Sequence, residues 1–315
     1  RYIPEKLEAS WNFINKIWNS ARFVLMNIDE DLEYKDLKFD HLNLCDKWIL
    51  NRLNNVIEEV DANMDKFEFV NVGSELYKFI WDDFCSWYIE LTKVHLNSDN
   101  EVEKQASAHT LVYVLNAIVR MLHPFMPFVT EEIYQAIPHL EESICISKYP
   151  TVNPDFNDEN INKQFTYLMD IVKGVREIRA NYTIKNAIEV EYSIETKDEN
   201  LQALLDQCVP YLKKLCNATC VGYNQETSKD VATAMIQGGN TLIVELGAYV
   251  DKEAEKQKLQ AELQKLEGEI KRCTNMLSNE KFVSKAPQAK VDSERQKLED
   301  YTSKYNAVKE KLAAM

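Results

Sequence analysis

Six side chains in the first 52 residues combine an aromatic plane with basic and amide groups. Trp48 has Lys47 beside it and Arg52 one helical turn later, on the same side of a helix. Unstacked nucleic-acid bases stack on aromatic or guanidinium planes and form hydrogen bonds along their edges. These residue types therefore predict a single-stranded nucleic-acid site, and burial of Trp48 in the core is the alternative interpretation. The predicted set is Asn19, Arg22, Asn27, Lys47, Trp48 and Arg52.

Arg22 is the strongest single prediction in this set. It stands at the end of an otherwise apolar helical segment, where its guanidinium could contact a base edge or a phosphate. An ordinary solvated surface charge is the alternative.

Sequence patterns typical of catalysis are missing. The chain contains neither a GxGxxG or GxxxxGK[ST] loop nor an HExxH motif. Asp82 and Asp83 are neighbours, but adjacent helical positions diverge by about 100°, which makes an acid–base pair improbable. His123 precedes Pro124 at an expected helix end, where we expect it to have a structural role.

The 7 cysteines are scattered, and none forms a CxxC pair. Cys208, Cys216 and Cys220 are the nearest group, and no histidine lies close to them in the sequence. A zinc site needs cysteine or histidine partners at ligand spacing. We therefore expect buried, reduced thiols, as in a cytoplasmic protein, and no metal site.

Charge is distributed unevenly along the 315 residues, whose formal net charge is -14. Residues 248–315 carry 14 basic and 12 acidic side chains, which leaves 23 basic and 39 acidic side chains in residues 1–247. An acidic region cannot bind a polyanion non-specifically. Any nucleic-acid contact in residues 1–247 must therefore be local and selected by shape.

Length and composition favour a helical, multidomain protein. The chain is long enough for two or three domains, and its 7 glycines favour long helices over turn-rich folds. No apolar run reaches the length of a membrane span. Because the sequence begins at Arg1 with no leader, we expect a fragment of a longer protein that is not secreted.

Residues 1–150 have the hydrophobic spacing of a helical bundle. Asp46 stands where it could cap the second helix, and Pro124 is expected to end the fourth. The expected helices are 5–27, 72–94, 101–122 and 130–136, together with one that begins after Asp46 and reaches residue 64. The face that the first helix is expected to bury consists of Leu7, Trp11, Ile14, Trp18, Ala21 and Leu25.

Residues 151–247 are expected to form a small α+β domain. The proline- and asparagine-rich segment 151–160 is typical of a linker. Residues 188–194 alternate apolar and polar side chains, as in a half-buried strand. The expected helices are 162–181 and 200–216, and the further expected strands are 219–223 and 241–246.

Residues 248–315 have two heptad arms separated by a break at Pro287, which predicts an antiparallel coiled-coil hairpin. Each arm of about 25 residues would extend for roughly 38 Å. The expected seam consists of Leu259, Leu263, Leu266, Ile270, Cys273 and Leu277 on one arm, and Leu298, Tyr301, Tyr305, Val308 and Leu312 on the other. Basic residues toward the tip are Lys271, Arg272, Lys281, Lys285 and Lys290. These side chains predict phosphate contacts, and solvated heptad flanks are the alternative.

Six segments together resemble the C-terminal region of the valyl-tRNA synthetases, a class I aminoacyl-tRNA synthetase family. They are residues 16–24 (KIWNSARFV), 46–50 (DKWIL), 81–90 (WDDFCSWYIE), 120–132 (RMLHPFMPFVTEE), 172–179 (VKGVREIR) and 279–287 (NEKFVSKAP). The segment 120–132 is similar to a signature shared with the isoleucine and leucine enzymes. One departure is 183–186 (TIKN), where the family usually has a proline-containing loop.

The resemblance implies a mainly α protein with three parts. They are an anticodon-binding domain at 1–150, the α+β domain at 151–247 and a tRNA-binding arm at 248–315. It also implies that the catalytic and editing domains lie upstream, with the His-Ile-Gly-His motif and the sites for ATP and magnesium. The parent enzyme would attach valine to its tRNA, and this chain would have no catalytic centre or cofactor of its own.

The partner that the resemblance implies is the tRNA accepting valine, with no DNA and no membrane, in a cytoplasmic and monomeric parent. The alternative function is a non-catalytic helical scaffold whose coiled coil contacts another protein. Binding of valine-accepting tRNA against another tRNA at fixed salt would discriminate between the two.

Overall fold

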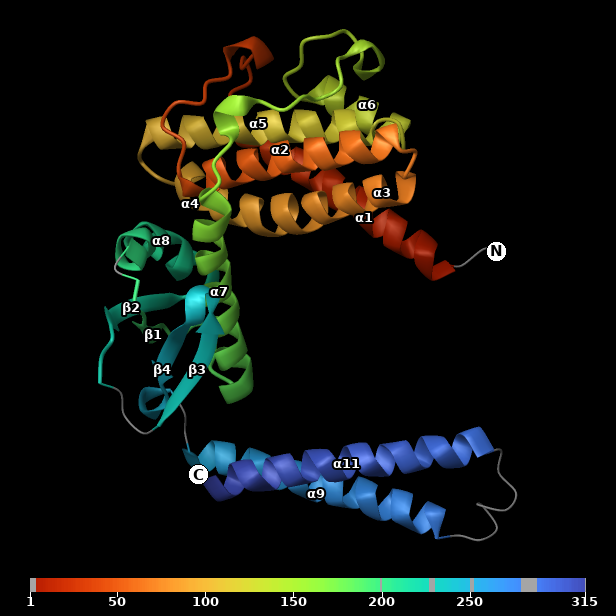
Figure 1. Cartoon of the computed structure of the whole chain (residues 1–315), viewed down its shortest axis with the longest axis vertical. Helices are drawn as coiled ribbons and strands as arrows, with labels where there is room; N and C mark the ends of the chain where they lie inside the picture. Colours follow the sequence, from red (N-terminus) through yellow and green to blue (C-terminus); the bar gives the residue numbers. More distant parts are fainter. Residues whose placement is uncertain (1–3, 199, 227–229, 250–251, 279–287, 315) are drawn as a thin grey trace. The chain divides into compact units, whose positions relative to one another are not determined.

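The computed structural model describes residues 4–198, 200–226, 230–249, 252–278 and 288–314 (Figure 1). These residues form two compact units. The first comprises Arg1–Ile178, Lys185–Thr227 and Ala232–Val244, and the second comprises Arg179–Ile184, Ser228–Val231 and Glu245–Met315. The protein is mainly α-helical, as the sequence predicts. Among the described residues, no helix is long and apolar enough to cross a membrane.

The first unit begins with a helical bundle in which α2, α3 and α5 run side by side (Figure 1). Its elements are α1 (Pro4–Leu25), α2 (Leu44–Asp65), α3 (Phe69–Lys78), the π-helical η2 (Phe79–Tyr88), α4 (Ile89–Leu96), α5 (Glu101–Leu122) and α6 (Pro127–Ala136). Short 3-10 turns are η1 (Tyr34–Asp36) and η3 (Ile144–Ile146). The helix boundaries follow the hydrophobic periodicity closely, and α5 has the predicted ones.

The N-terminus of α2 corrects one prediction. The cap is Asn43, whose side chain accepts hydrogen bonds from the backbone N–H groups of Cys45 and Asp46. Asp46 occupies the third helical position and accepts a hydrogen bond from the backbone of Asn43 in return. This reciprocal capping box satisfies donors that the first helical turn leaves without partners.

The predicted helix 72–94 exists, but its central part is π-helical. The Ser86 hydroxyl donates to the Trp81 carbonyl oxygen, five residues earlier, over 2.6 Å. A π turn adds a residue per turn and so rotates the side chains that follow it. Within η2 the buried side chains are Phe79, Ile80, Phe84, Cys85 and Tyr88. Periodicity alone cannot show such a change, because the spacing of three and four persists on both sides.

The buried face of α1 differs from the predicted one. Phe13, Ile17, Ala21 and Val24 are buried, together with Ser20. Trp11 is 63% exposed, Trp18 42% and Leu25 37%. Two stripes with helical spacing share Ala21 in this helix, and the bundle buries the one without the tryptophans. The expected burial of Trp11, Trp18 and Leu25 was therefore wrong, and that of Ala21 is confirmed.

The segment 151–160, expected to be a linker, packs against the bundle. Its 3-10 turn η4 (Pro154–Phe156) buries Phe156, whose ring lies 5.1 Å from that of Phe39 and 5.6 Å from that of Tyr113. The side-chain amide of Asn54 donates to the carbonyl oxygen of Asn153. The bundle and the residues that follow therefore belong to the same compact unit, and the boundary predicted at residue 150 stays a prediction.

A four-stranded sheet follows, with strand order β2-β1-β4-β3. Its elements are α7 (Ile161–Tyr182), β1 (Val190–Glu195), α8 (Asn200–Cys216), β2 (Ala218–Tyr223), β3 (Val231–Ile236) and β4 (Asn240–Glu245). Strand β1 pairs in parallel with β2 and antiparallel with β4. The sequence did not predict β3, whose composition is weakly typical of strands.

Two glycine positions shape this α+β part. A Cβ atom at Gly174 of α7 would lie 2.9 Å from the Cβ of Ala234 in β3, so the helix packs on the sheet only because that position lacks a side chain. Gly238, between β3 and β4, has a φ of 78°, which glycine adopts at little cost.

In the second unit, α9 (Lys252–Leu277) and α11 (Gln288–Ala314) lie side by side in opposite directions (Figure 1). Leu266 and Cys273 of α9 and Val291 of α11 are buried. The other predicted seam residues whose side chains are described are half-buried. The helical hairpin is thus confirmed, while the predicted turn around Pro287 lies outside the described residues and supercoiling of the two arms stays a prediction.

Candidate nucleic-acid interface

Trp48 lies in the core, which corrects its predicted role as a platform for a base. Only 3% of its surface is exposed. Its ring stacks on that of Phe165 in α7, with 3.7 Å between ring centroids and 8° between planes. The face that a base would need is therefore occupied by a residue 117 positions later in the chain.

The basic neighbours of Trp48 have different environments. Lys47 is exposed on α2. The Nε and Nη2 atoms of Arg52 both lie 3.1 Å from Oδ2 of Asp83, in a largely shielded ion pair between α2 and η2. Burial raises the pKa of Asp83, and the adjacent Arg52 guanidinium opposes that shift. Arg52 therefore holds two bundle elements together, whereas Lys47 stays a prediction for RNA contact.

A buried polar network centred on Asp46 fixes the start of α2. The hydroxyl of Tyr88 donates to Oδ1 of Asp46 over 2.6 Å, and Ser107 donates to Oδ2 over 3.1 Å. Burial raises the pKa of Asp46 to about 6, although these hydrogen bonds and the nearby His95 act in the opposite direction. In segment 46–50, Asp46 and Trp48 therefore point inward for structural reasons and Lys47 points outward.

The exposed face of α1 carries the chemistry that Trp48 was expected to supply. Trp11, Trp18 and Arg22 are exposed at steps of seven and four residues, and Asn15 lies between the two indoles. Asn19, one residue after Trp18, is exposed as well. This face therefore offers two aromatic planes, two amides and a guanidinium to solvent. Sequence reasoning assigned these indoles to the core, although the competing stripe of Phe13, Ile17, Ala21 and Val24 was visible.

Asn27 is less available than predicted. It is half-buried, and its side-chain amide donates to the carbonyl oxygen of Phe23 over 2.7 Å. That carbonyl lies in the last turn of α1, where the helix leaves acceptors without partners. Asn27 therefore helps to end the helix.

Beside α1, a row of rings includes one cation. Phe13 stacks on Tyr77 at 4.9 Å, and Tyr77 stacks on Trp81 at 5.5 Å. The Lys16 ammonium lies 3.9 Å from the centroid of the Trp81 ring and donates to the hydroxyl of Ser86. These ring contacts pack α1 against α3 and η2, on the side of the helix opposite its exposed face.

The hairpin residues predicted to contact phosphate differ in their surroundings. Lys271 is exposed on α9. Arg272 is exposed but forms ion pairs with Glu269 at 2.9 Å and with Glu294 of α11 at 3.4 Å. Lys281 and Lys285 lie outside the described residues, and Lys290 lies in α11. Part of the Arg272 charge is thus neutralised within the hairpin.

All seven cysteines lie in the described part of the chain, and none of them is in a disulfide. Cys45, Cys85, Cys208, Cys216 and Cys273 are buried, as expected, but Cys220 is half-buried and Cys145 is exposed. The expectation of burial fails at Cys145 because η3 places it at the surface.

Two family models match the chain. Residues 46–194 match the anticodon-binding domain of tRNA ligases, and residues 251–315 match the tRNA binding arm of valyl tRNA synthetases. The first match runs from α2 to β1, and the second covers the helical hairpin.

Curated relatives match the chain over its whole length. It is 42% identical to the valine–tRNA ligase of Enterococcus faecalis over 317 aligned positions, covering 100% of this chain and 36% of the relative. Identity is also 42% with the valine–tRNA ligases of Listeria innocua, covering 99% of this chain and 35% of the relative, and of Staphylococcus aureus, covering 99% and 36%. The chain therefore spans about a third of the length of these relatives, at their C-terminal end.

Proposed function

Because the chain belongs to the valyl-tRNA synthetase family, as the match to the C-terminal part of its members shows, we propose that it positions tRNA for a valine–tRNA ligase. The whole enzyme would join valine to its tRNA with ATP and magnesium, in the cytoplasm. Those ligands would bind a nucleotide-binding domain outside the third of the relatives that this chain spans. The work left to these residues is recognition.

The exposed face of α1 carries this proposal furthest. Trp11 and Trp18 present indole rings to solvent, with Asn15, Asn19 and Arg22 between and beside them. Unstacked anticodon bases need such planes for stacking and such amides for edge hydrogen bonds. Trp18 therefore replaces Trp48 as the expected base-stacking residue, and Arg22 and Asn19 keep their predicted roles.

The acidic charge of residues 1–247 supports local rather than general RNA binding. A body with 39 acidic and 23 basic side chains repels phosphates over most of its surface. Binding there must depend on a few well-placed contacts. The hairpin, with a small basic excess, would instead contact phosphates of the tRNA body and carry no sequence preference.

Binding of the full 315-residue chain to valine-accepting tRNA, compared with another tRNA at one salt concentration, tests the proposal. Trp18→Ala should weaken binding by about 5–150-fold, since one base stack contributes about 1–3 kcal/mol. The matched control is Phe67→Ala, which removes a ring that is 78% exposed outside α1 and should leave affinity unchanged.

A tRNA with a substituted anticodon sharpens the test. Trp18→Ala should reduce affinity for the natural tRNA far more than for the substituted tRNA, because the complex with the substituted tRNA already lacks the contact between Trp18 and the anticodon base. If Trp18→Ala and Arg22→Ala both bind the two tRNAs as the unmodified chain does, the α1 face is not the anticodon site.

A further inference from the structure

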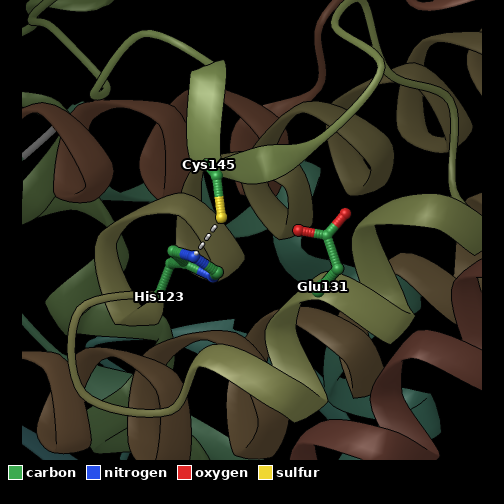
Figure 2. Close-up of side chains that lie close together, drawn as sticks. All are labelled: His123, Glu131 and Cys145. Carbon is green, nitrogen blue, oxygen red and sulfur yellow. Dashed lines mark hydrogen bonds between the residues drawn. The ribbon is translucent and has the colours of Figure 1, made fainter.

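Three potential metal ligands meet where α5 ends. His123 directly follows α5, Glu131 belongs to α6 and Cys145 belongs to η3. One imidazole nitrogen, one carboxylate oxygen and the sulfur all lie within 4.8 Å of one another. Figure 2 shows the Cys145 sulfur directed at the His123 ring, with the Glu131 carboxylate at one side of the same space.

The distance between sulfur and nitrogen fits a shared ion. The Cys145 sulfur lies 3.4 Å from Nε2 of His123. Two tetrahedral zinc bonds, of about 2.3 Å to sulfur and 2.0–2.1 Å to nitrogen, place these atoms about 3.5 Å apart. A bound ion would therefore need little movement of either side chain.

Thr130 is placed to support the His123 tautomer that a metal requires. Nδ1 of His123 lies 2.8 Å from the Thr130 hydroxyl oxygen, which lies 2.9 Å from the carbonyl oxygen of Met126. When the hydroxyl donates its hydrogen to this carbonyl, it accepts from Nδ1–H of His123, and this is the tautomer in which Nε2 carries the lone pair. The Nε2 lone pair therefore points toward Cys145, and Thr130 supplies the outer hydrogen bond typical of metal-bound histidines.

Glu131 is held in place by its own neighbours. Its Oε1 accepts a hydrogen bond from Gln135 over 2.8 Å, and its Oε2 accepts one from the Ser143 hydroxyl over 3.0 Å. These hydrogen bonds, that of Gln135 above all, lower the pKa of Glu131 below its usual value, although burial acts in the opposite direction. The Ser143 hydroxyl oxygen also accepts from the backbone N–H of Cys145, which ties the thiol-bearing turn to α6.

We propose that His123, Glu131 and Cys145 bind a zinc ion, with the fourth tetrahedral position open to water. Thiolate, imidazole and carboxylate are the ligand types that zinc accepts together, whereas magnesium and calcium prefer oxygen alone. Without the ion the Cys145 thiol donates to Nε2 of His123, and on binding it releases its proton to solvent. Cys145 is exposed, so the ion reaches the site directly.

Occupation would join three pieces of the chain that are separate in sequence. The end of α5, the helix α6 and the turn η3 would share one ion, which adds to the hydrogen bonds of Thr130 and Ser143. Because an ion that binds the folded form raises its stability, zinc should raise the thermal midpoint of the chain. None of the three ligands belongs to α1, so this proposal does not rest on tRNA recognition by that helix.

Titration of the full, tag-free chain with cobalt(II) tests the proposal. A thiolate ligand should produce a sulfur-to-cobalt charge-transfer band in the near ultraviolet, and one equivalent of zinc should remove it. Cys145→Ser should abolish the band, since the thiolate is its source. Thr130→Val keeps the three ligands but removes the outer hydrogen bond, so cobalt affinity should fall by about 10–100-fold.

Cys220→Ser is the matched control, because Cys220 is the other cysteine that is not buried. It should keep the full band and the same affinity. Circular dichroism confirms that each variant is folded. The proposal is overturned if the unmodified chain shows no charge-transfer band, or if Cys145→Ser retains the band with unchanged affinity.

Discussion

The bundle and the C-terminal hairpin are both helical, but they are stabilised in different ways. Helix α5 buries 15 of its 22 residues, among them polar ones such as Ser107 and Asn116. In the hairpin, the described side chains that are buried are Leu266, Cys273, Val291 and Glu294. A helix surrounded by others gains stability from nearly every side chain, whereas two paired helices gain it from one seam.

Charge separates the same two regions. Residues 1–247 are strongly acidic, and residues 248–315 have a small basic excess. In the hairpin, moreover, Arg272 is partly neutralised by Glu269 and Glu294. If the chain positions tRNA as proposed, this difference predicts that the acidic residues 1–247 contact RNA at a few sites selected by shape, and that the hairpin contacts it through dispersed positive charge.

The largest expected effect distinguishes the inside of the bundle from its surface. Trp48→Ala should lower the free energy of unfolding by about 3–5 kcal/mol, because it leaves a cavity against Phe165. Trp11→Ala, at a 63% exposed site, should change it by no more than about 0.5 kcal/mol. Urea unfolding of both variants measures the difference, and similar values would contradict the assignment of the two indoles.

Leucine-to-alanine changes compare the two kinds of packing directly. Leu53→Ala, at a 1% exposed site in α2, should cost about 2–5 kcal/mol. Leu266→Ala, at a 9% exposed position in the hairpin, should cost about 2 kcal/mol or less, since one side of the seam is solvent. Hydrogen exchange of the α2 and α9 amides reports each region separately. A larger loss of protection in the hairpin would reverse the comparison.

Asp46 gives the bundle a pH dependence of its own. Its pKa in the folded chain is about 6, above the usual value of 3.8, so the folded form binds the proton more tightly. Its contribution to stability is therefore complete below about pH 4 and is lost as the pH rises through 6. Between pH 7.5 and 5, the unmodified chain should gain about 1.4 kcal/mol relative to Asp46→Asn.

Urea unfolding at the two pH values measures this gain. Asp82→Asn changes an exposed carboxylate in the same bundle and is the matched control. A constant difference between the unmodified chain and Asp46→Asn would show that the buried carboxyl does not titrate in this range.

The smallest expected effect concerns the arm. Lys271→Gln should weaken tRNA binding slightly and equally for different tRNAs, because a phosphate contact carries no base preference. The slope of log affinity against log salt should flatten by about 0.7–0.9. Lys304→Gln, at an exposed position nearer the other end of the hairpin, should leave the slope unchanged. Equal slopes for all three proteins would remove Lys271 from the interface.

Local sequence was sufficient for most helices and for the helical hairpin. The predicted helices 101–122 and 200–216 agree with α5 and α8 because each has a clear periodicity and ends at turn-forming residues. The two arms of the hairpin were equally readable, since a heptad pattern is a local property. The strand β3 was missed, because Ala232 and Ala234, which have little preference for a strand, interrupt its strand-forming residues.

Tertiary structure decided which side chains are free for binding. Trp48 is buried because Phe165 stacks on it, and Trp18 is exposed because the bundle accepts the stripe of Ile17, Ala21 and Val24. The meeting of His123, Glu131 and Cys145 likewise depends on how η3 folds back beside α5 and α6. Hydrophobic periodicity specifies a helix and the faces that it could bury, but the residues that pack on one of those faces are distant in the sequence. The sequence by itself therefore determined the elements and the family resemblance, and the packing of distant elements chose the residues available to a ligand.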